Sequence, residues 1–257
     1  MTEPLRAFDT GAATDVGKIR RHNEDAYLAS PQAGVWAVAD GMGGHEGGQL
    51  ASSTVVAALR KIAGPAPLDS LLAQCRDELE RANHRLLQVA TERAGKIIGT
   101  TVATLLAGDD DYACVWSGDS RIYLIRGATI TQLSRDHTEV AELVAEGVLS
   151  EEEAQNWPRR NVVTRAIGVH PDTEIEILTG TLQLGDIFLI CSDGLTTHVS
   201  DAEILAHVRG NGAQSACDSL VALTLQRGAS DNVTVVIARF AAGSGTQLFP
   251  QARGARR

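Results

Sequence analysis

The apolar positions of this chain of 257 residues follow two patterns, short continuous runs and a helical spacing. Short apolar runs bounded by Gly, Asp or Ser are typical of strands, and we expect them at 35–39, 98–107, 112–116, 121–126, 129–133, 174–179, 186–191 and 232–240. Helical spacing predicts helices after a glycine-rich stretch at 41–48 as far as about residue 63, and at 68–93, 200–208 and 213–225. The runs between 98 and 133 are expected to form one antiparallel meander.

Strands follow strands and helices follow helices in this order, without a regular βαβα alternation. The order indicates an α+β fold whose antiparallel sheets are covered by helices on their outer faces. The acidic, helical stretch 138–160 is interrupted by Gly147 and Pro158, so we expect it to form a flap over a site instead of a core layer. One domain is expected over residues 1–240, followed by a disordered tail at 241–257.

The composition favours a soluble, cytoplasmic protein. A hydrophobic content of 44% is enough for a sizeable core. Because no apolar run approaches the ~20 residues that span a bilayer, and the N-terminus lacks an apolar signal core, no membrane partner is expected. The formal net charge of −9 argues against nucleic acid as a partner, since that binding depends on clustered Lys and Arg. The four cysteines are widely spaced and are expected to be reduced core residues, not a disulfide framework or a zinc site.

Acidic residues at the ends of the apolar runs provide the candidate chemistry. Brought together, they would form an oxygen-rich site, and carboxylates without matching His or Cys favour Mg or Mn over zinc or copper. Two such ions about 3.5 to 4 Å apart can hold a hydroxide for in-line attack on phosphorus. Singly, each Asp-Gly pair is more typical of a turn, and only the combination favours a site. The acids are Glu24, Asp40, Asp119, Asp193 and Asp231.

Seven motifs, in order, resemble the bacterial metal-dependent type 2C (PPM) serine/threonine protein phosphatases. They are Arg20-x-x-Asn23-Glu24-Asp25, Asp40-Gly41 within 38–44, Gly99-Thr100-Thr101, Gly118-Asp119 within 117–121, Asp136-His137, Ser192-Asp193-Gly194 and Asp231-Asn232 within 231–234. The similarity extends from about residue 17 to 240. It implies two central antiparallel β-sheets in a sandwich flanked by pairs of α-helices, a four-layer αββα arrangement with a metal centre in a cleft at one end.

The resemblance also implies a ligand set for two Mn²⁺ or Mg²⁺ ions. Asp40 would bridge the two ions, which would hold the attacking hydroxide between them. Asp193 and Asp231 would complete the first ion site. Glu24 and the backbone carbonyl of Gly41 would serve the second, partly through water.

Further roles follow from the same resemblance. Arg20 would hold the substrate phosphate through its planar guanidinium, and Asp25 would orient a metal-bound water. Asp119 is similar to the residue that recruits a weaker third ion together with the first-site aspartate. Two positions depart from the family pattern: Met42 stands where some members have a His as general acid, and Thr197 stands where animal members have an acid. The proton donor and the occupancy of the third site therefore stay open.

Together these features predict a monomeric hydrolase that removes phosphate from phosphoserine and phosphothreonine in proteins and opposes a serine/threonine kinase. Arg20, Asp25 and Asp40 are the catalytic candidates, while Arg121 is expected to be a structural ion-pair partner. One alternative is a degenerate phosphatase fold that acts as a regulatory module, which hydrolysis of a chromogenic phosphate ester with Mn would exclude. The other is a phosphatase of small phosphate esters, which competition between phosphopeptide and nucleotide substrates would test.

Overall fold

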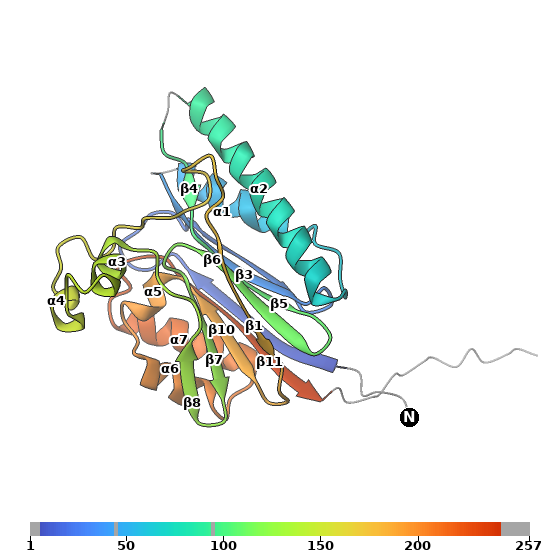
Figure 1. Cartoon of the computed structure of the whole chain (residues 1–257). Helices are drawn as coiled ribbons and strands as arrows, with labels where there is room; N and C mark the ends of the chain where they lie inside the picture. The colour runs from blue at the N-terminus through green and yellow to red at the C-terminus, as the bar shows by residue number, and fades with distance from the viewer. Residues whose placement is uncertain (1–5, 44–45, 94–95, 243–257) are drawn as a thin grey trace, which may run out of the picture.

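The computed structural model describes residues 6–43, 46–93 and 96–242. Two antiparallel sheets pack face to face in its centre (Figure 1). The first sheet has the strand order β1 (Arg6–Asp15), β11 (Val233–Ala242), β10 (Ile187–Cys191), β7 (Arg121–Arg126) and β8 (Thr129–Gln132). The second has the order β2 (Asp25–Ser30), β3 (Val35–Met42), β5 (Val102–Ala107), β6 (Asp111–Ser117) and β9 (Glu176–Thr181), with β4 (Gly99–Thr100) paired to β3.

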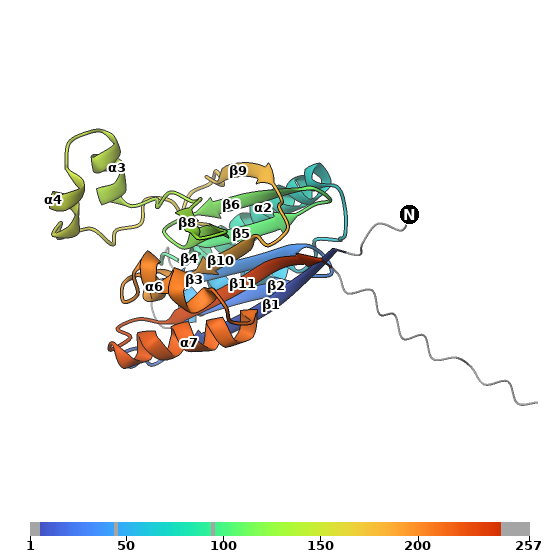
Figure 2. The same ribbon diagram turned by 90° about the horizontal axis from the view of Figure 1, so that it is seen from below.

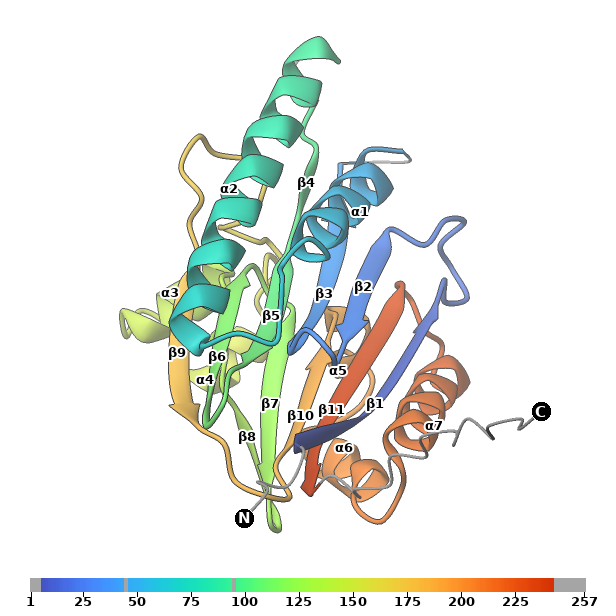
Figure 3. The ribbon, with the colours of Figure 1, turned by 90° about the vertical axis from the view of Figure 1, so that its right-hand side faces the viewer.

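Helices cover the outer face of each sheet, as Figure 3 shows from the side. On the second sheet lie α1 (Glu46–Leu59) and α2 (Leu68–Glu92), and on the first lie α6 (Asp201–Val208) and α7 (Ala213–Gln226). The short helix α5 (Asp193–Thr196) follows β10 directly. The α+β fold and the four-layer αββα arrangement are thereby confirmed. Among the described residues, each helix is either too short or too polar to cross a membrane.

Strand β10 shows why the apolar runs of this sequence become central strands. Ile187, Leu189 and Cys191 pack with the helices on one face, while Phe188 and Ile190 enter the layer between the sheets. All five are buried. Successive side chains point to opposite faces of a strand, so a strand that is covered on both faces reads as a continuous apolar run.

The expected meander between residues 98 and 133 is wrong. Strands β5 and β6 form a hairpin in the second sheet, but β7 and β8 form a hairpin in the first. The chain crosses between the sheets at 118–120, where Gly118 has a φ of +105° and a Cβ would lie 2.6 Å from the Thr101 side chain. Glycine is thus required at this crossing, because its conformation and its space both exclude a side chain.

The sequence also predicts a flap at 138–160 and a tail that begins at residue 241. The stretch 138–160 contains α3 (Glu139–Ala145) and α4 (Glu151–Gln155), which project from the sandwich (Figure 2). Strand β11 extends to Ala242, so residues 241 and 242 belong to the sheet and not to the tail. The disorder expected for the rest of the tail falls outside the described residues. All four cysteines are free and buried, as expected.

Candidate active site

The predicted acids meet at a cleft of about 980 Å³, where the strands of both sheets begin or end. Asp40 lies near the end of β3, and Asp193 follows β10. Asp231 precedes β11, and Asp119 lies at the crossing between the sheets. The lining residues include Arg20, Glu24, Asp40, Gly41, Asp119, Asp193 and Asp231. The structure therefore brings these seven predicted site residues together.

Backbone pairing fixes the position of Asp40. Its N–H donates to Thr101 Oγ1 at 3.0 Å, and its carbonyl accepts from the Thr101 N–H at 2.9 Å and from Thr100 Oγ1 at 2.9 Å. Asp25 of β2 lies directly opposite in the antiparallel register. Two acids from neighbouring strands are thus held side by side at one edge of the second sheet.

Two glycines let Glu24 approach this edge. The Gly41 N–H donates to the Glu24 carbonyl at 3.2 Å, and a Cβ on Gly41 would lie 2.1 Å from the Gly48 carbonyl oxygen in the first turn of α1. A Cβ on Gly48 would lie 2.8 Å from Glu24 Oε2. The glycine-rich stretch after Asp40 is consequently a close-packed junction of strand, helix and acidic side chain.

Asp193 is the first residue of α5, and its carboxylate lines the same cleft as Asp40. Its Oδ1 atom is buried without a hydrogen-bond partner among the described residues. Burial and the nearby Asp231 raise the pKa of Asp193. A buried carboxylate oxygen without a donor is costly, and a cation is the group that would satisfy it.

Asn232 is a site residue that the sequence analysis missed. Its Oδ1 accepts from the Glu24 N–H at 2.8 Å, and its Nδ2 donates to the carbonyls of Val16 and His22 at 2.9 and 3.0 Å. Its own N–H donates to Asp231 Oδ1 at 2.8 Å. One amide thereby ties the Glu24 loop to the Asp231 turn. The Asp-Asn pair was visible in the sequence, but only the acid was given a role.

Asp25 lies beneath the cleft and is held by two hydroxyls. Ser192 Oγ and Thr234 Oγ1 donate to its Oδ2 at 2.8 and 2.7 Å, while Oδ1 has no partner among the described residues. Burial above all, together with repulsion from Asp193 and Asp231, raises the pKa of Asp25 to about 6.

Asp119 faces a neighbouring pocket of about 440 Å³ that Thr197 also lines. Burial, followed by the charges of Asp193 and Asp136, raises the pKa of Asp119 to about 7. Asp136 itself is bound by Arg121 through Nε and Nη2, at 3.0 and 2.7 Å. The expectation that Arg121 is a structural ion-pair partner is confirmed.

Arg20 lies at the cleft rim with 55% of its side chain exposed, and its Nη2 is 2.7 Å from Asp231 Oδ2. The predicted phosphate ligand is thus paired with a predicted metal ligand. Exposed ion pairs of this kind are weak and exchangeable. Both groups can therefore turn to other partners in the cleft.

A family model described as protein phosphatase 2C matches residues 19–233. This chain belongs to the protein phosphatase 2C family. The family resemblance expected from the motifs is confirmed.

Similar 2C phosphatases come from several bacteria. The serine/threonine protein phosphatase PstP of Mycobacterium tuberculosis is 38% identical over 228 residues, which cover 88% of this chain but only 44% of PstP. This chain thus spans less than half the length of that relative. The serine/threonine phosphatase Stp of Listeria welshimeri is 32% identical over 233 residues, which cover 87% of this chain and 92% of the relative.

Several solved structures resemble this one closely. PppA, a regulatory component of T6SS in Pseudomonas aeruginosa, has a TM-score of 0.85 at 38% identity and covers 91% of this chain and 99% of its own. The catalytic domain of PstP in complex with two manganese ions has a TM-score of 0.81 at 33% identity and covers 92% of this chain and all of its own.

The acidic cleft of this 2C phosphatase fits divalent cations. The pKa values of Asp25, Asp40, Asp119 and Asp193 are all raised, first by burial and also by the charges of neighbouring aspartates. In the part of the chain that the structure describes, no three His, Cys, Asp or Glu side chains form a ready-made ligand group. The backbone gathers the expected ligands, and their side chains have to turn toward a bound ion. Oxygen donors of this kind suit hard cations.

The raised pKa values predict an unusual pH dependence of stability for the metal-free protein. An acid whose pKa rises on folding, as for Asp25 and Asp119, takes up a proton in the folded state while it is still ionised in the unfolded chain. We expect the melting temperature without metal to fall as the pH rises from about 4 to 7, through the interval between the unfolded and folded pKa values. Calorimetry in a chelator checks this, with Asp25→Asn expected to weaken the slope. A melting temperature that rises steadily over this range contradicts the assignment.

Proposed function

We propose that this chain is a metal-dependent phosphatase that hydrolyses phosphoserine and phosphothreonine in proteins. The observation that carries this proposal is a set of mutually repelling, buried or half-buried carboxylates at one cleft, with an arginine at its rim. Mn²⁺ or Mg²⁺ would be held by Asp40, Asp193, Asp231, Glu24 and the carbonyl of Gly41. Bound there, two such ions would supply Lewis acidity and an activated water for in-line attack on phosphorus.

The protein groups position the substrate and a proton. Arg20 is long, exposed and planar, so it can leave Asp231 and bind two phosphate oxygens through its guanidinium fork. Asp25 lies beneath the cleft with Oδ2 held by two hydroxyls and its buried Oδ1 without a donor, and its proposed role is to orient a metal-bound water. Asp119 would bind a weaker third ion at the neighbouring pocket. Met42 lines the cleft and cannot transfer a proton.

The substrates are proposed to be phosphorylated proteins that a serine/threonine kinase modifies. The phosphatase names and bacterial origins of the relatives support this proposal. A monomeric state and a cytoplasmic location remain predictions.

Phosphate release from a phosphothreonine peptide tests the proposal. We expect turnover with Mn²⁺, a lower or equal rate with Mg²⁺, and none after chelation, with recovery when the ion is returned. A free nucleotide at the same concentration should compete poorly with the peptide. Absence of metal-dependent release would favour a regulatory module, and stronger hydrolysis of the nucleotide would favour a phosphatase of small esters.

Arg20→Lys tests the phosphate ligand. Lysine keeps the charge but loses the fork, and a lost charge-assisted hydrogen bond of about 1.5–3 kcal/mol corresponds to a ten- to hundredfold loss. We expect this loss mainly in KM for the phosphopeptide, measured by steady-state kinetics. The matched change Arg76→Lys on α2 should leave KM as it is. An unchanged KM in Arg20→Lys would remove Arg20 from the phosphate site.

A further inference from the structure

Two cationic segments border the acidic cleft. Residues 18–22, with the sequence Lys-Ile-Arg-Arg-His, are all exposed, and residues 19–22 line the cleft. Among the described residues, no ion pair engages Arg21, whereas its neighbour Arg20 is paired with Asp231. On the flap side, Arg159 and Arg160 follow α4. One basic segment thus lines the acidic cleft and a second basic pair lines the adjoining pockets, in a protein whose formal net charge is −9.

Three adjoining cavities connect the cleft to the flap. Asn161 lines the cleft of about 980 Å³, the pocket of about 440 Å³ beside Asp119, and a third pocket of about 560 Å³ at the base of the flap. Arg160 lines the second and the third. Because neighbouring residues of one segment line them, the three cavities lie next to one another between the cleft and the flap.

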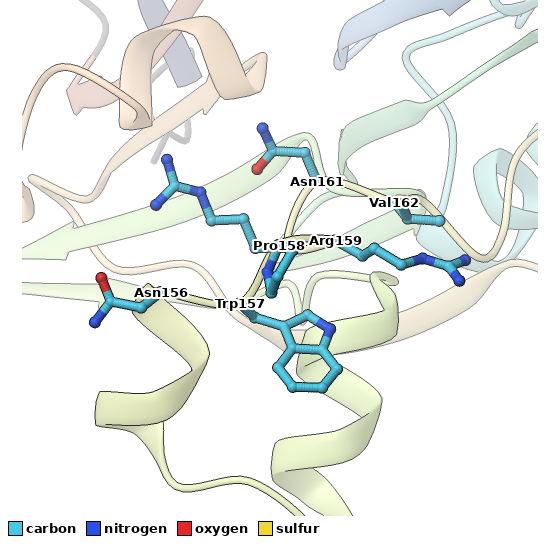
Figure 4. A pocket seen from close by; sticks show the side chains of 7 residues that line it. Asn156, Trp157, Pro158, Arg159, Asn161 and Val162 are labelled. Atoms are coloured by element: carbon cyan, nitrogen blue, oxygen red, sulfur yellow. The ribbon is translucent and has the colours of Figure 1, made fainter.

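The flap pocket carries positive charge and no lining acid. It is formed by Asn156, Trp157, Pro158, Arg159, Arg160, Asn161 and Val162. Figure 4 shows the Trp157 ring directed toward the flap helices, whereas Arg159 and Asn161 point to other sides of the segment. Two guanidinium groups and two amides without a lining carboxylate suit an anionic side chain.

One contact already shows a carboxylate at this rim. Arg159 Nη2 lies 2.8 Å from Glu139 Oε2, and 65% of the Arg159 side chain is exposed. Such a pair contributes only about 0–1 kcal/mol, so an incoming carboxylate can replace Glu139. Two other acids of the flap are engaged elsewhere: Glu142 accepts from Thr164 Oγ1, and Glu153 caps the first turn of α4 at Ser150.

We infer that this phosphatase selects phosphosites that have acidic residues on both sides. The inference rests on the proposed function and adds a substrate class to it. Arg21 binds a carboxylate on one side of the phosphorylated residue, while Arg159 and Arg160 bind a carboxylate on the other side, at the flap pocket. Complementary charge at a rim acts on encounter and on selectivity between substrates, and it weakens as salt rises.

Matched phosphothreonine peptides test this inference with Mn²⁺ present. One peptide has neutral flanks, and the others carry glutamates about two to seven residues away, before the phosphothreonine, after it, or on both sides, a span of up to about 23 Å in an extended chain. We expect kcat/KM to be about tenfold higher for the doubly acidic peptide than for the neutral one, with the ratio falling toward one near 1 M salt, where the Debye length is about 3 Å.

Variants show which arginines recognise the acid on each side of the phosphothreonine. Arg21→Gln should abolish the preference for acid on one side only, and the double variant Arg159→Gln, Arg160→Gln should abolish it on the other. Arg76→Gln, which removes the same charge from an exposed site on α2, should leave the ratio unchanged.

Equal kcat/KM for all peptides in the unmodified protein overturns the inference. The inference is also overturned if both variants lose kcat/KM by the same factor for neutral and acidic peptides. If no peptide loses phosphate with Mn²⁺, the proposed function itself has failed, and the two failures are therefore distinguishable.

Discussion

Asp193→Asn is expected to lower kcat/KM for a phosphopeptide about a thousandfold, which corresponds to ~4 kcal/mol of transition-state stabilisation. The substitution keeps the shape of the side chain but removes one charge from the proposed ligand set. It also relieves repulsion, because Asp231 and burial together raise the pKa of Asp193. We therefore expect the metal-free variant to melt higher than the unmodified protein, by about 2–4 °C for each kcal/mol of repulsion removed.

A fall in activity together with a rise in the melting temperature of the metal-free variant distinguishes a lost ligand from a damaged fold. Calorimetric titration should show weaker Mn²⁺ binding by the variant, and added Mn²⁺ should raise its melting temperature less than that of the unmodified protein. Asp109→Asn, in the exposed turn between β5 and β6, is the matched control and should change neither quantity. Near-normal turnover or Mn²⁺ affinity in Asp193→Asn would refute the site assignment.

Gly194→Ala is the second change with a large expected effect. A Cβ at this position would lie 1.9 Å from the Asn232 carbonyl oxygen, so α5 and the turn before β11 have to move apart. Overpacking of this kind costs about 1–3 kcal/mol of stability. Because Asp193 and Asp231 are the neighbours of the two clashing residues, we expect activity to fall further, about a hundredfold, as for misplacement of a site by ~1 Å.

Thermal melting and steady-state kinetics measure the two effects of Gly194→Ala. Gly212→Ala serves as its control, because a Cβ there meets nothing within 4 Å. It should leave activity unchanged. If Gly194→Ala retains full activity, the close contact between α5 and the Asp231 turn does not position the ligands.

The sequence predicted those strands and helices whose buried positions show as a regular pattern of apolar residues. The bounds of β7 agree with the expected 121–126, and β10 differs by one residue, because both strands have continuous apolar and buried interiors. Strand β1 was missed because Gly, Ala, Thr and Asp dominate Arg6–Asp15, and its register is set by β11, more than 200 residues away. The choice of sheet for β7 also escaped prediction, since alternation indicates a strand but not its partner.

The acids of the site could be predicted from the sequence, whereas the residues that position them could not. The acids stood out because their motifs combine a charged residue with glycine or asparagine at strand ends. Ser192, Thr234 and Asn232, which position Asp25 and Glu24, carry no periodic signal of their own, and only the folded chain shows their hydrogen bonds. The pairing of Arg20 with Asp231 likewise joins residues that are 211 positions apart.

The proposed site residues are divided between the two sheets: Asp40 and Asp25 belong to one, while Asp193 and Asp231 adjoin strands of the other. The spacing of the ligands is therefore set by the apolar layer between the sheets, where Trp36 and Phe188 are fully buried. The sizes of the side chains in that layer determine the distance between the two halves of the site. A small change in sheet separation should therefore lower the catalytic rate even where the melting temperature hardly changes.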